Sequence, residues 1–411
     1  MLQPSRPGGG PEHRKGKGTR VANEREAMLA KSTTLYLGPW YRRSPFFEAT
    51  LRAGCTAYDV YNHMLLPAYY DDPGTEYLAL ANDVTLWDVA VERTVEVSGP
   101  DADRLVDMIT CRDLTRCAVK QGKYMLVTAP HGGIVNDPVL MHVGEDRWWM
   151  QLADSDAGLY AMGVAASAGL DAEVTFPDVY PCQVQGPKSG LTLEKLVGPA
   201  IYDLRYYWCD EFQIEDIPVV ITRTGWTAVP GFEVNILSND GGTELWDAIM
   251  RAGEEFGIRA IAPCEARRIE AGIFNYGSDM TIDDTPFHVM GLERLVEDQP
   301  QDYLGKDVLE RIRREGVDRK LVGIELDMDE LQAELEWFWP VHRDGRQVGR
   351  VTDAVWSPGL RKNIGYVWVP TELAEPGTEL DVETPEGTVQ GRTAEIPFVD
   401  PRKEVPAGSL R

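Results

Sequence analysis

The chain has 411 residues and carries 66 acidic against 41 basic side chains, which gives a net charge of −25. A chain this acidic is a poor binder of the nucleic-acid phosphate backbone, and none of its apolar runs approaches the roughly 18 to 20 residues that cross a bilayer. Its length predicts two or three domains, and with 43% apolar residues we expect a folded, soluble, cytoplasmic protein without nucleic-acid or membrane partners.

The first 34 residues are expected to form a disordered tail. Residues 1–20 hold three consecutive glycines, three prolines and five basic residues, with almost nothing to bury. From residue 35 onward the pattern becomes mixed α and β. Thr94–Ser98 alternates with period two and predicts a strand, and apolar residues at helical spacing over 102–109 predict the helix that follows.

A second unit of the same kind lies further along the chain. Residues 218–223 and 232–237 predict two strands, and Thr243 is the expected N-cap of a helix whose apolar face runs to Phe256. Two such units predict two related or interlocked α+β lobes over residues 35–316.

The last part of the chain changes character after a helix that ends at Gly316. Residues 317–411 consist mostly of short β-branched and aromatic runs, separated by turns that contain glycine or proline. This pattern predicts a separate antiparallel barrel or sandwich domain.

Common catalytic and metal-binding motifs are missing from the sequence. There is no phosphate-binding P-loop, dinucleotide-binding glycine motif, serine-hydrolase elbow or zinc-protease helix. The six cysteines form no C-x-x-C pair, and the six histidines are mostly far apart. We therefore expect neither a disulfide scaffold nor a metal site.

A Gly-Gly turn at 132–133 leads into a strand that begins with two short polar side chains, Asn136 and Asp137. Neighbouring strand residues face opposite ways, so both side chains reach one cavity only if the backbone bends, which Pro138 favours. The alternative is a turn carboxylate that bonds its own backbone.

Two further segments place charged residues beside apolar ones. Strand alternation puts Glu233 on the face opposite its neighbours, where it can accept two parallel hydrogen bonds from a planar N–H pair; a surface glutamate is the alternative. Arg267 and Arg268 point about 100° apart on a helix, so one can be inward and paired while the other stays in water. The alternative is a buried structural ion pair with Glu270 or Asp279.

These segments and several others, in this order, resemble the glycine-cleavage T-protein (aminomethyltransferase) family of tetrahydrofolate-dependent one-carbon transferases. The likeness is closer to the dimethylsulfoniopropionate demethylase branch, and it extends over nearly the whole folded chain. The matching stretches are YNHMLLP (61–67), LWDVAVERTVEVSGPDADRLVDMIT (86–110), GGIVNDPVL (132–140), RWWMQLADSD (147–156), DVYPCQVQGPKS (178–189), RIEAGIFNYGSDM (268–280), AVWSP (354–358) and IPFVDP (396–401).

The resemblance implies a three-domain α+β cloverleaf: two α+β folate-binding lobes, a C-terminal antiparallel β-barrel, and a central channel for tetrahydrofolate. It also implies site residues. Asp137 falls on the acidic position beside the reactive N5 of folate, Asn136 replaces an acidic neighbour, and Glu233 falls on the carboxylate that binds the pterin edge.

Other positions are implied to hold the folate. Arg268, Tyr124 and Tyr276 fall on positions that shape or line the channel, and Arg392 on one that reaches the glutamate tail. The sequence leaves the oligomeric state open, a homo-oligomer included.

The donor is the second small-molecule partner that the resemblance implies. Tyr61, Trp149, Trp226 and Tyr207 are candidate walls of the donor site, because aromatic faces attract a sulfonium cation by about 0.5 to 2 kcal/mol each. The turn 226–230 lacks a lysine that close demethylases carry, and its aromatic character also suits a methoxy-aromatic donor.

We therefore expect a tetrahydrofolate-dependent demethylase that moves a methyl group from a sulfonium or methoxy-aromatic donor to N5. One alternative is a methylenedioxy-aromatic or aminomethyl donor, which would give 5,10-methylene-tetrahydrofolate. The other is a non-catalytic folate-binding protein.

Overall fold

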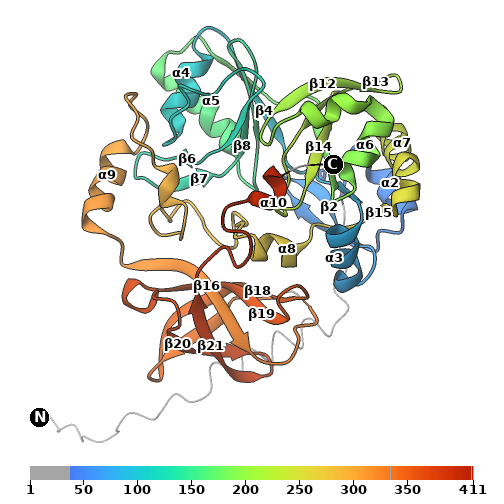
Figure 1. Cartoon of the computed structure of the whole chain (residues 1–411). Helices are drawn as coiled ribbons and strands as arrows, with labels where there is room; N and C mark the ends of the chain where they lie inside the picture. The colour runs from blue at the N-terminus through green and yellow to red at the C-terminus, as the bar shows by residue number, and fades with distance from the viewer. Residues whose placement is uncertain (1–37, 334, 409, 411) are drawn as a thin grey trace, which may run out of the picture. The chain divides into compact units, whose positions relative to one another are not determined.

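The computed structural model describes residues 38–333, 335–408 and 410, so the expected disordered tail, 1–34, lies outside the described residues. Residues 42–411 form one unit. The described end of the preceding unit, residues 38–41, forms a turn in which the Tyr41 N–H donates to the Gly38 carbonyl. The ribbon combines helices, largely antiparallel sheets and a barrel (Figure 1), which confirms the predicted α+β class.

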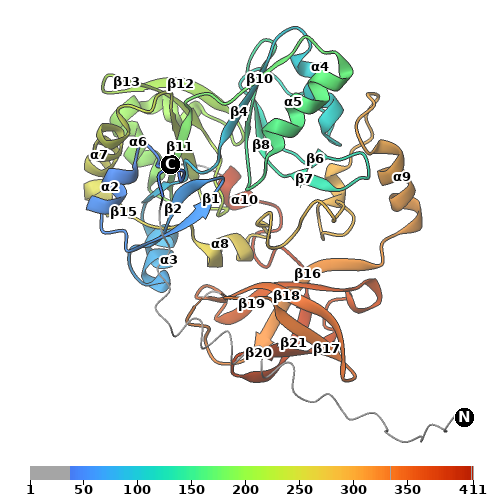
Figure 2. The ribbon, with the colours of Figure 1, turned by 180° about the vertical axis from the view of Figure 1, so that it is seen from behind.

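The first sheet has five strands in the order β10-β4-β9-β8-β5, and helices α4 and α5 pack on it (Figures 1 and 2). Its elements are β4 (Thr94–Ser98), α4 (Ala102–Ile109), β5 (Gly122–Tyr124), β8 (Val139–Gly144), β9 (Arg147–Gln151), α5 (Ala157–Ala168) and β10 (Glu173–Thr175). The predicted strand and helix at 94–109 are confirmed. Leu105, Val106 and Ile109 are fully buried, and burial of each such side chain stabilises the fold by about 1.5 to 3 kcal/mol.

The second sheet has six strands in the order β12-β13-β14-β11-β3-β15. Its strands are β3 (Thr85–Asp88), β11 (Tyr180–Gln185), β12 (Cys209–Ile214), β13 (Ile217–Thr222), β14 (Gly231–Ile236) and β15 (Arg259–Ala260). The helices around it are α2 (Phe47–Arg52), α6 (Ser189–Val197) and α7 (Gly242–Gly253). The adjacent hairpin of β1 (Ala57–Tyr61) and β2 (Met64–Tyr69) leads into α3 (Pro73–Asn82).

The two sheets are interlocked along the chain. Strand β3 belongs to the second sheet although it precedes every strand of the first, and the chain returns to the second sheet only at β11. A two-stranded ribbon, β6 (Val127–Thr128) with β7 (Ile134–Asn136), connects β5 to β8 within the first lobe. The second sheet therefore depends on segments that lie on both sides of the first sheet in sequence.

The start of α7 differs from the sequence prediction. The helix begins at Gly242, with Gly241 as N-cap in the left-handed region (φ +86°), and no side chain caps it. Thr243 is thus the second helical residue. A Cβ at Gly242 would lie 2.4 Å from the Pro45 carbonyl oxygen, so the close approach of the chain at Pro45 requires glycine at this position.

The predicted C-terminal barrel is confirmed as a closed antiparallel barrel in the order β16-β19-β18-β17-β20-β21, with β21 pairing back onto β16. Its strands are β16 (Arg319–Asp327), β17 (Trp339–Arg343), β18 (Arg346–Ser357), β19 (Lys362–Pro370), β20 (Glu379–Thr384) and β21 (Gly387–Ala394). Closure leaves no edge strand exposed for pairing with another chain. The sequence did not predict β17, a five-residue strand that contains Pro340.

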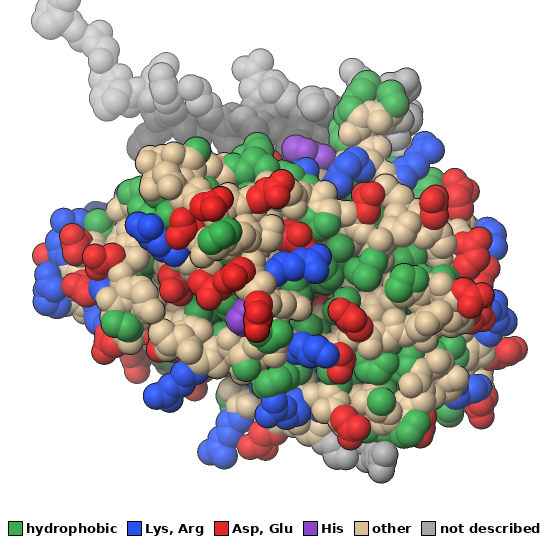
Figure 3. Space-filling model, turned by 90° about the horizontal axis from the view of Figure 1, so that it is seen from above, with side chains coloured by type: hydrophobic (Ala, Val, Ile, Leu, Met, Phe, Trp, Pro, Cys, Tyr) green, Lys and Arg blue, Asp and Glu red, His purple; other side chains and the backbone are tan. Residues whose placement is uncertain are grey.

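Three short or peripheral helices complete the described unit: α8 (Glu265–Glu270), α9 (Lys306–Glu315) and α10 (Glu404–Ala407). Helix α9 is followed by Gly316, as predicted. No helix of the described residues is long and apolar enough to cross a membrane. On the face shown in Figure 3, acidic side chains are scattered over the surface with basic ones among them.

Candidate active site

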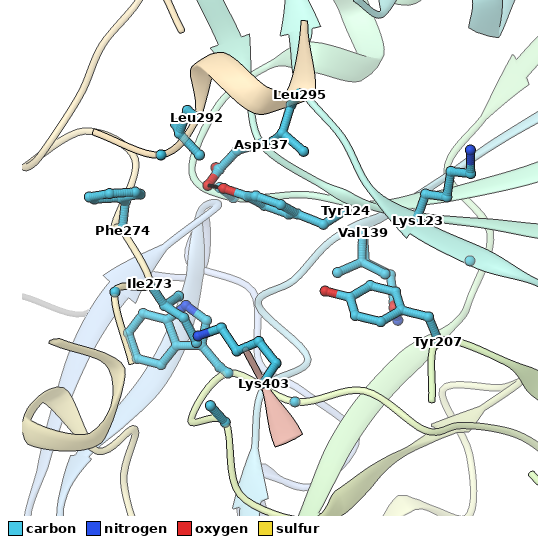
Figure 4. A pocket seen from close by; sticks show the side chains of 18 of the residues that line it. Lys123, Tyr124, Asp137, Val139, Tyr207, Ile273, Phe274, Leu292, Leu295 and Lys403 are labelled. Carbon is cyan, nitrogen blue, oxygen red and sulfur yellow. Dashed lines mark hydrogen bonds between the residues drawn. The ribbon is translucent and has the colours of Figure 1, made fainter. Parts of the chain in front are cut away.

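A cavity of about 480 Å³ lies where the two sheets, the β1 hairpin and three later segments meet. Tyr124, Val139 and Gln151 reach it from the first sheet, and Glu233 reaches it from the second. The later segments are 272–274, 290–295 and 396–403. Asp137 and Tyr124 lie on one wall, and Lys403 lies on the opposite side (Figure 4).

Asp137 follows β7 and projects into this cavity. Its Oδ2 accepts a hydrogen bond from the Tyr124 hydroxyl at 2.9 Å, whereas its Oδ1 is buried and has no partner within the described residues. Burial raises the pKa of this carboxyl from 3.8 to about 7, although the Tyr124 hydrogen bond favours the ionised form. Asp137 is therefore a carboxyl with a free buried oxygen that changes charge near neutral pH.

Asn136 faces away from the cavity, as strand alternation predicts. Its amide nitrogen donates to the Ala153 carbonyl at 2.9 Å and to the Ser155 hydroxyl at 2.8 Å, and its Oδ1 accepts from the Ala153 N–H. Asn136 is fully buried and does not line the cavity. It ties the strand that carries Asp137 to the loop after β9, which positions Asp137.

Glu233 lies on β14 with its carboxylate in a dense set of donors. Its Oε1 accepts from Gln183 Nε2 at 3.0 Å, and its Oε2 accepts from the hydroxyls of Thr224 at 2.6 Å and Thr222 at 3.2 Å. Phe232 and Val234 point into the apolar core, so the predicted alternation holds. Burial raises the pKa of Glu233, while its three side-chain donors favour the ionised form.

Glu92 is a second glutamate of the same cavity, and sequence reasoning missed it. It lies in the turn between β3 and β4, and its pKa is raised well above the ordinary value, first by burial and then by the charge of Glu233. No hydrogen bond of its carboxylate to another described residue is present. Two carboxyl groups that raise each other's proton affinity in one cavity favour a ligand that offers N–H groups or positive charge.

Aromatic side chains form much of the remaining wall. Tyr61, Tyr207 and Trp226 line the cavity, as does Tyr206, which stacks edge-on against Tyr207 with ring centroids 4.8 Å apart. Burial raises the pKa of Tyr61 and Tyr207, so both hydroxyls stay neutral. Tyr207 lies in the turn before β12 and has φ +59°, in the left-handed region.

Trp149, the fourth predicted aromatic wall, lies elsewhere. Its ring packs between the two sheets with Met141, Val179 and Val220, and it is only 4% exposed. The indole N–H donates to Glu96 at 2.7 Å. Trp149 does not line the cavity although it lies on the same face of β9 as Gln151, which does, because the second lobe covers that face at Trp149.

Arg268 is fully buried and joins α8 to the barrel rather than lining the cavity. Its guanidinium pairs with Asp279 at 3.0 Å and also with Glu265 and Asp353, and it lies 5.4 Å from the centre of the Trp226 ring. The alternative prediction for this segment, a buried structural ion pair, is therefore confirmed for Arg268 with Asp279. Arg267 is also paired, with Glu270, instead of standing free in water.

Tyr276 and Arg392 also lie outside the cavity lining. The Tyr276 hydroxyl donates to the Ile134 carbonyl at 2.9 Å. Burial, and after it the charge of Asp137, raises the pKa of Tyr276 to about 12. Arg392 lies on the outside of β21 with its side chain 68% exposed, 3.6 Å from Glu379 on the neighbouring strand. Strand alternation turns it outward, away from any folate in the cavity.

Four other cations line the cavity: Arg112, Lys123, Arg294 and Lys403. Lys403 comes from the C-terminal segment, where burial lowers its pKa to about 8 and its ammonium donates to the Ala271 carbonyl. Arg223 secures this segment by donating to the carbonyls of Pro406, at 3.0 Å, and Gly408. The cavity thus receives a lysine from a distant part of the chain.

No group of three or more histidine, cysteine, aspartate or glutamate side chains among the described residues is arranged to hold a metal ion. What the cavity offers instead is a carboxyl with an unpartnered buried oxygen, a pair of glutamates, aromatic walls and cationic side chains. These features suit a ligand that has an N–H-rich end, a flat body and an anionic end.

Comparison with known proteins agrees with the resemblance seen in the sequence. Residues 46–299 match the GCVT N-terminal domain, and residues 319–400 match the glycine cleavage T-protein C-terminal barrel domain. Over 346 residues, covering 84% of this chain and 94% of the relative, the sequence is 36% identical to the dimethylsulfoniopropionate demethylase of Ruegeria pomeroyi. It is 29% identical over 366 residues to an aminomethyltransferase of Bacillus subtilis, covering 87% and 99% of the two chains.

Among solved structures, the glycine cleavage system aminomethyltransferase T from Bartonella henselae superposes with a TM-score of 0.78. The sequence identity is 21%, and the match covers 88% of this chain and 99% of that one. This likeness shows a shared fold. The two domain matches and the demethylase relative together show that the chain belongs to the glycine cleavage T-protein family.

Proposed function

We propose that this protein is a tetrahydrofolate-dependent transferase that moves a one-carbon unit, in the simplest case a methyl group, from a small donor to N5 of tetrahydrofolate. Membership of the family and the demethylase relative support the reaction class. The observation that carries the proposal is the free buried oxygen of Asp137 in the same cavity as the Glu233 carboxylate, which three side-chain donors hold in place.

The lining residues fit tetrahydrofolate chemically. Its pterin edge carries neighbouring N–H donors, and Glu233 with Glu92 supplies buried acceptors that repel each other when no such ligand is bound. Its glutamate tail carries carboxylates, and Arg112, Lys123 and Arg294 supply cations on the lining. When bound, tetrahydrofolate supplies the N5 amine that accepts the carbon.

The residues of this chain contribute mainly position and charge. Tyr124 and the strand anchored by Asn136 hold Asp137 in one orientation, and the free Oδ1 of Asp137 accepts a proton or stabilises a developing positive charge. Alignment of two reacting groups at about 3 to 3.5 Å can supply roughly 7 to 11 kcal/mol of the barrier, so rigid placement is the larger share.

For the donor, we propose a small methylated cation ahead of a neutral methoxy-aromatic. The cavity holds carboxyl groups at Glu92 and Asp137 close to the aromatic side chain of Tyr61, whose pKa responds to both charges after burial. Carboxylates and aromatic faces both attract a sulfonium. Lys403 provides a charge for a donor carboxylate, so a zwitterion of the dimethylsulfoniopropionate kind is compatible with the missing lysine of the turn 226–230.

The test is mass spectrometry of the folate pool after purified protein is incubated with tetrahydrofolate and a donor panel. The panel comprises dimethylsulfoniopropionate, glycine betaine, a methoxylated aromatic and a methylenedioxy aromatic. We expect 5-methyl-tetrahydrofolate with one of the first two donors. Formation of 5,10-methylene-tetrahydrofolate would instead support the methylenedioxy or aminomethyl alternative, and folate binding with no product from any donor would support a non-catalytic role.

A further inference from the structure

A second, smaller cavity of about 120 Å³ lies where the turn between β3 and β4 meets the segment between β10 and β11. None of its lining residues lines the main cavity. The turn contributes to both cavities, because Glu92 lines the main one and its neighbours Arg93 and Thr94 line the small one. The volume has room for several waters or one small polyatomic ion, and none for a folate or nucleotide.

Two arginines converge on this small cavity. Burial lowers the pKa of Arg93. The positive charge of Arg42 lowers it further, because the two guanidinium groups repel each other. Neither forms an ion pair within the described part of the chain. Among the residues that the structure describes, their side chains make a single hydrogen bond, a long one of 3.3 Å from Arg42 to the Asn62 carbonyl.

The orientation of Arg93 is set by its surroundings. Its guanidinium carbon lies 3.8 Å from the centre of the Phe176 ring, which covers one face of the group. Its Nε is buried and has no hydrogen-bond partner among the described residues. A stacked guanidinium with a free edge is the geometry that binds two oxygens of one anion.

Thr94 supplies a third donor. Its side chain is 2% exposed and lines the cavity, yet its Oγ1 has no hydrogen-bond partner in the described structure. Burial of a hydroxyl without a partner is unfavourable, so its presence beside two arginines that form no ion pair indicates that a ligand completes the set.

Acidic groups near the cavity do not neutralise it. Asp178 lies at the exposed rim, where its Oδ1 accepts from the Tyr180 hydroxyl at 2.9 Å and from Asn239 at 3.2 Å. Asp156 acts on Arg93 only at a distance, with no ion pair. The cavity therefore contains two cations, Arg42 and Arg93, and the Thr94 hydroxyl. Its one lining carboxylate, Asp178, already accepts two hydrogen bonds.

We propose that this cavity binds a small oxyanion, specifically a phosphate group, at a site separate from the one-carbon chemistry. The tetrahedral oxygens can accept from the free edge of Arg93, from Arg42 and from the Thr94 hydroxyl at once. The source is either free phosphate or the terminal phosphate of a phosphomonoester, which the open rim beside Asp178 admits.

The experiment is calorimetric titration of the full-length protein with inorganic phosphate and with glycerol 3-phosphate, at constant ionic strength in chloride. We expect saturable one-site binding. Arg93→Gln should weaken it roughly 10- to 100-fold, since a charged hydrogen-bonding group is lost, and Thr94→Val roughly 2- to 10-fold. Arg42→Gln should act like Arg93→Gln, because both cations face the ion.

Arg43→Gln is the matched control, because it makes the same charge change at the adjacent, exposed position, where the guanidinium lies over Phe47 instead. It should leave phosphate binding unchanged, as should Asp137→Asn in the main cavity. Thermal melts of each variant without phosphate show whether it is folded. Tighter binding of glycerol 3-phosphate would identify an ester as the ligand, and tighter binding of phosphate the free ion.

Absence of saturable binding by folded wild-type protein would overturn the proposal. So would phosphate affinity that survives in folded Arg42→Gln and Arg93→Gln, or tighter binding of acetate than of phosphate. None of these results depends on turnover, so they leave the proposed transfer reaction untouched.

Discussion

The two carboxyl groups assigned to the cavity, Asp137 and Glu233, are both buried, but their hydrogen-bonding environments differ. Glu233 accepts from three side chains, so its orientation is fixed and both oxygens are engaged. Asp137 accepts from Tyr124 alone and keeps one buried oxygen free. Burial alone therefore does not assign a role to a carboxyl group. A carboxylate fixed by several hydrogen bonds is suited to holding a ligand, and one with a hydrogen-bond acceptor left free is suited to reacting.

Replacement of Asp137 by Asn tests the reactive half of the comparison and carries the largest expected effect. Asn keeps the shape and can still accept from Tyr124, but it cannot take up a proton or carry negative charge. We expect turnover to fall about 10²- to 10⁴-fold with tetrahydrofolate affinity nearly unchanged, measured by product formation and by equilibrium binding. Undiminished turnover would remove Asp137 from the mechanism.

Replacement of Glu233 by Gln tests the binding half. The variant loses the charge that the ligand's N–H groups would meet, so we expect affinity for tetrahydrofolate to fall roughly 10- to 100-fold, seen in fluorescence or calorimetric titration. Glu211→Gln, at an exposed position of β12 in the same sheet, is the matched control. Wild-type affinity in Glu233→Gln would contradict the role given to this residue.

The protonation of Asp137 predicts a pH-dependent stability difference. Its pKa is about 7 in the folded protein against 3.8 in the unfolded chain, so the stability it contributes is full below about pH 4 and is lost as the pH rises to about 7. Asp137→Asn, which cannot ionise, should therefore gain stability over wild type across that window, by at most about 4 kcal/mol, and level off above it. Urea unfolding between pH 4 and 8 measures this gain; a constant difference across the range would show that the carboxyl has an ordinary pKa.

Lys403 gives a smaller effect on the donor side. If its ammonium meets a donor carboxylate, Lys403→Gln should raise the KM of a carboxylate-bearing donor about 2- to 10-fold and leave the KM for tetrahydrofolate unchanged. Its own pKa of about 8 predicts that the wild-type KM for that donor also rises as the pH passes 8. A variant that changes only the KM for tetrahydrofolate would assign Lys403 to the folate instead.

Local patterns predicted those parts of the site that depend on one strand. Alternation in β14 separates Glu233 from Phe232 and Val234, and alternation at β7 separates Asp137 from Asn136. The same rule could not exclude Trp149, because it lies on the same face of β9 as Gln151, and alternation does not say how far along a strand the cavity extends.

Other parts of the site come from tertiary contacts that no local pattern reports. Lys403 reaches the cavity from the C-terminal segment. Glu92 is recognised as a site residue only because it shares the cavity with Glu233, which comes from a distant strand. Arg42 and Arg93 likewise meet across separate segments. Sequence motifs identify site residues that lie on a single strand. Charged groups that come together from distant segments can be identified only in the folded structure.

The central claim is that the protein places an intact methyl group on tetrahydrofolate, and its most direct test is a transfer experiment with a fully deuterated methyl donor. The donor that the panel identifies, carrying CD₃ groups, is incubated with tetrahydrofolate and wild-type protein, and the folate product is weighed by mass spectrometry. The account predicts 5-methyl-tetrahydrofolate with all three deuteriums retained, formed about 10²- to 10⁴-fold more slowly by Asp137→Asn. A product that retains only two, or equal product from Asp137→Asn, would contradict it.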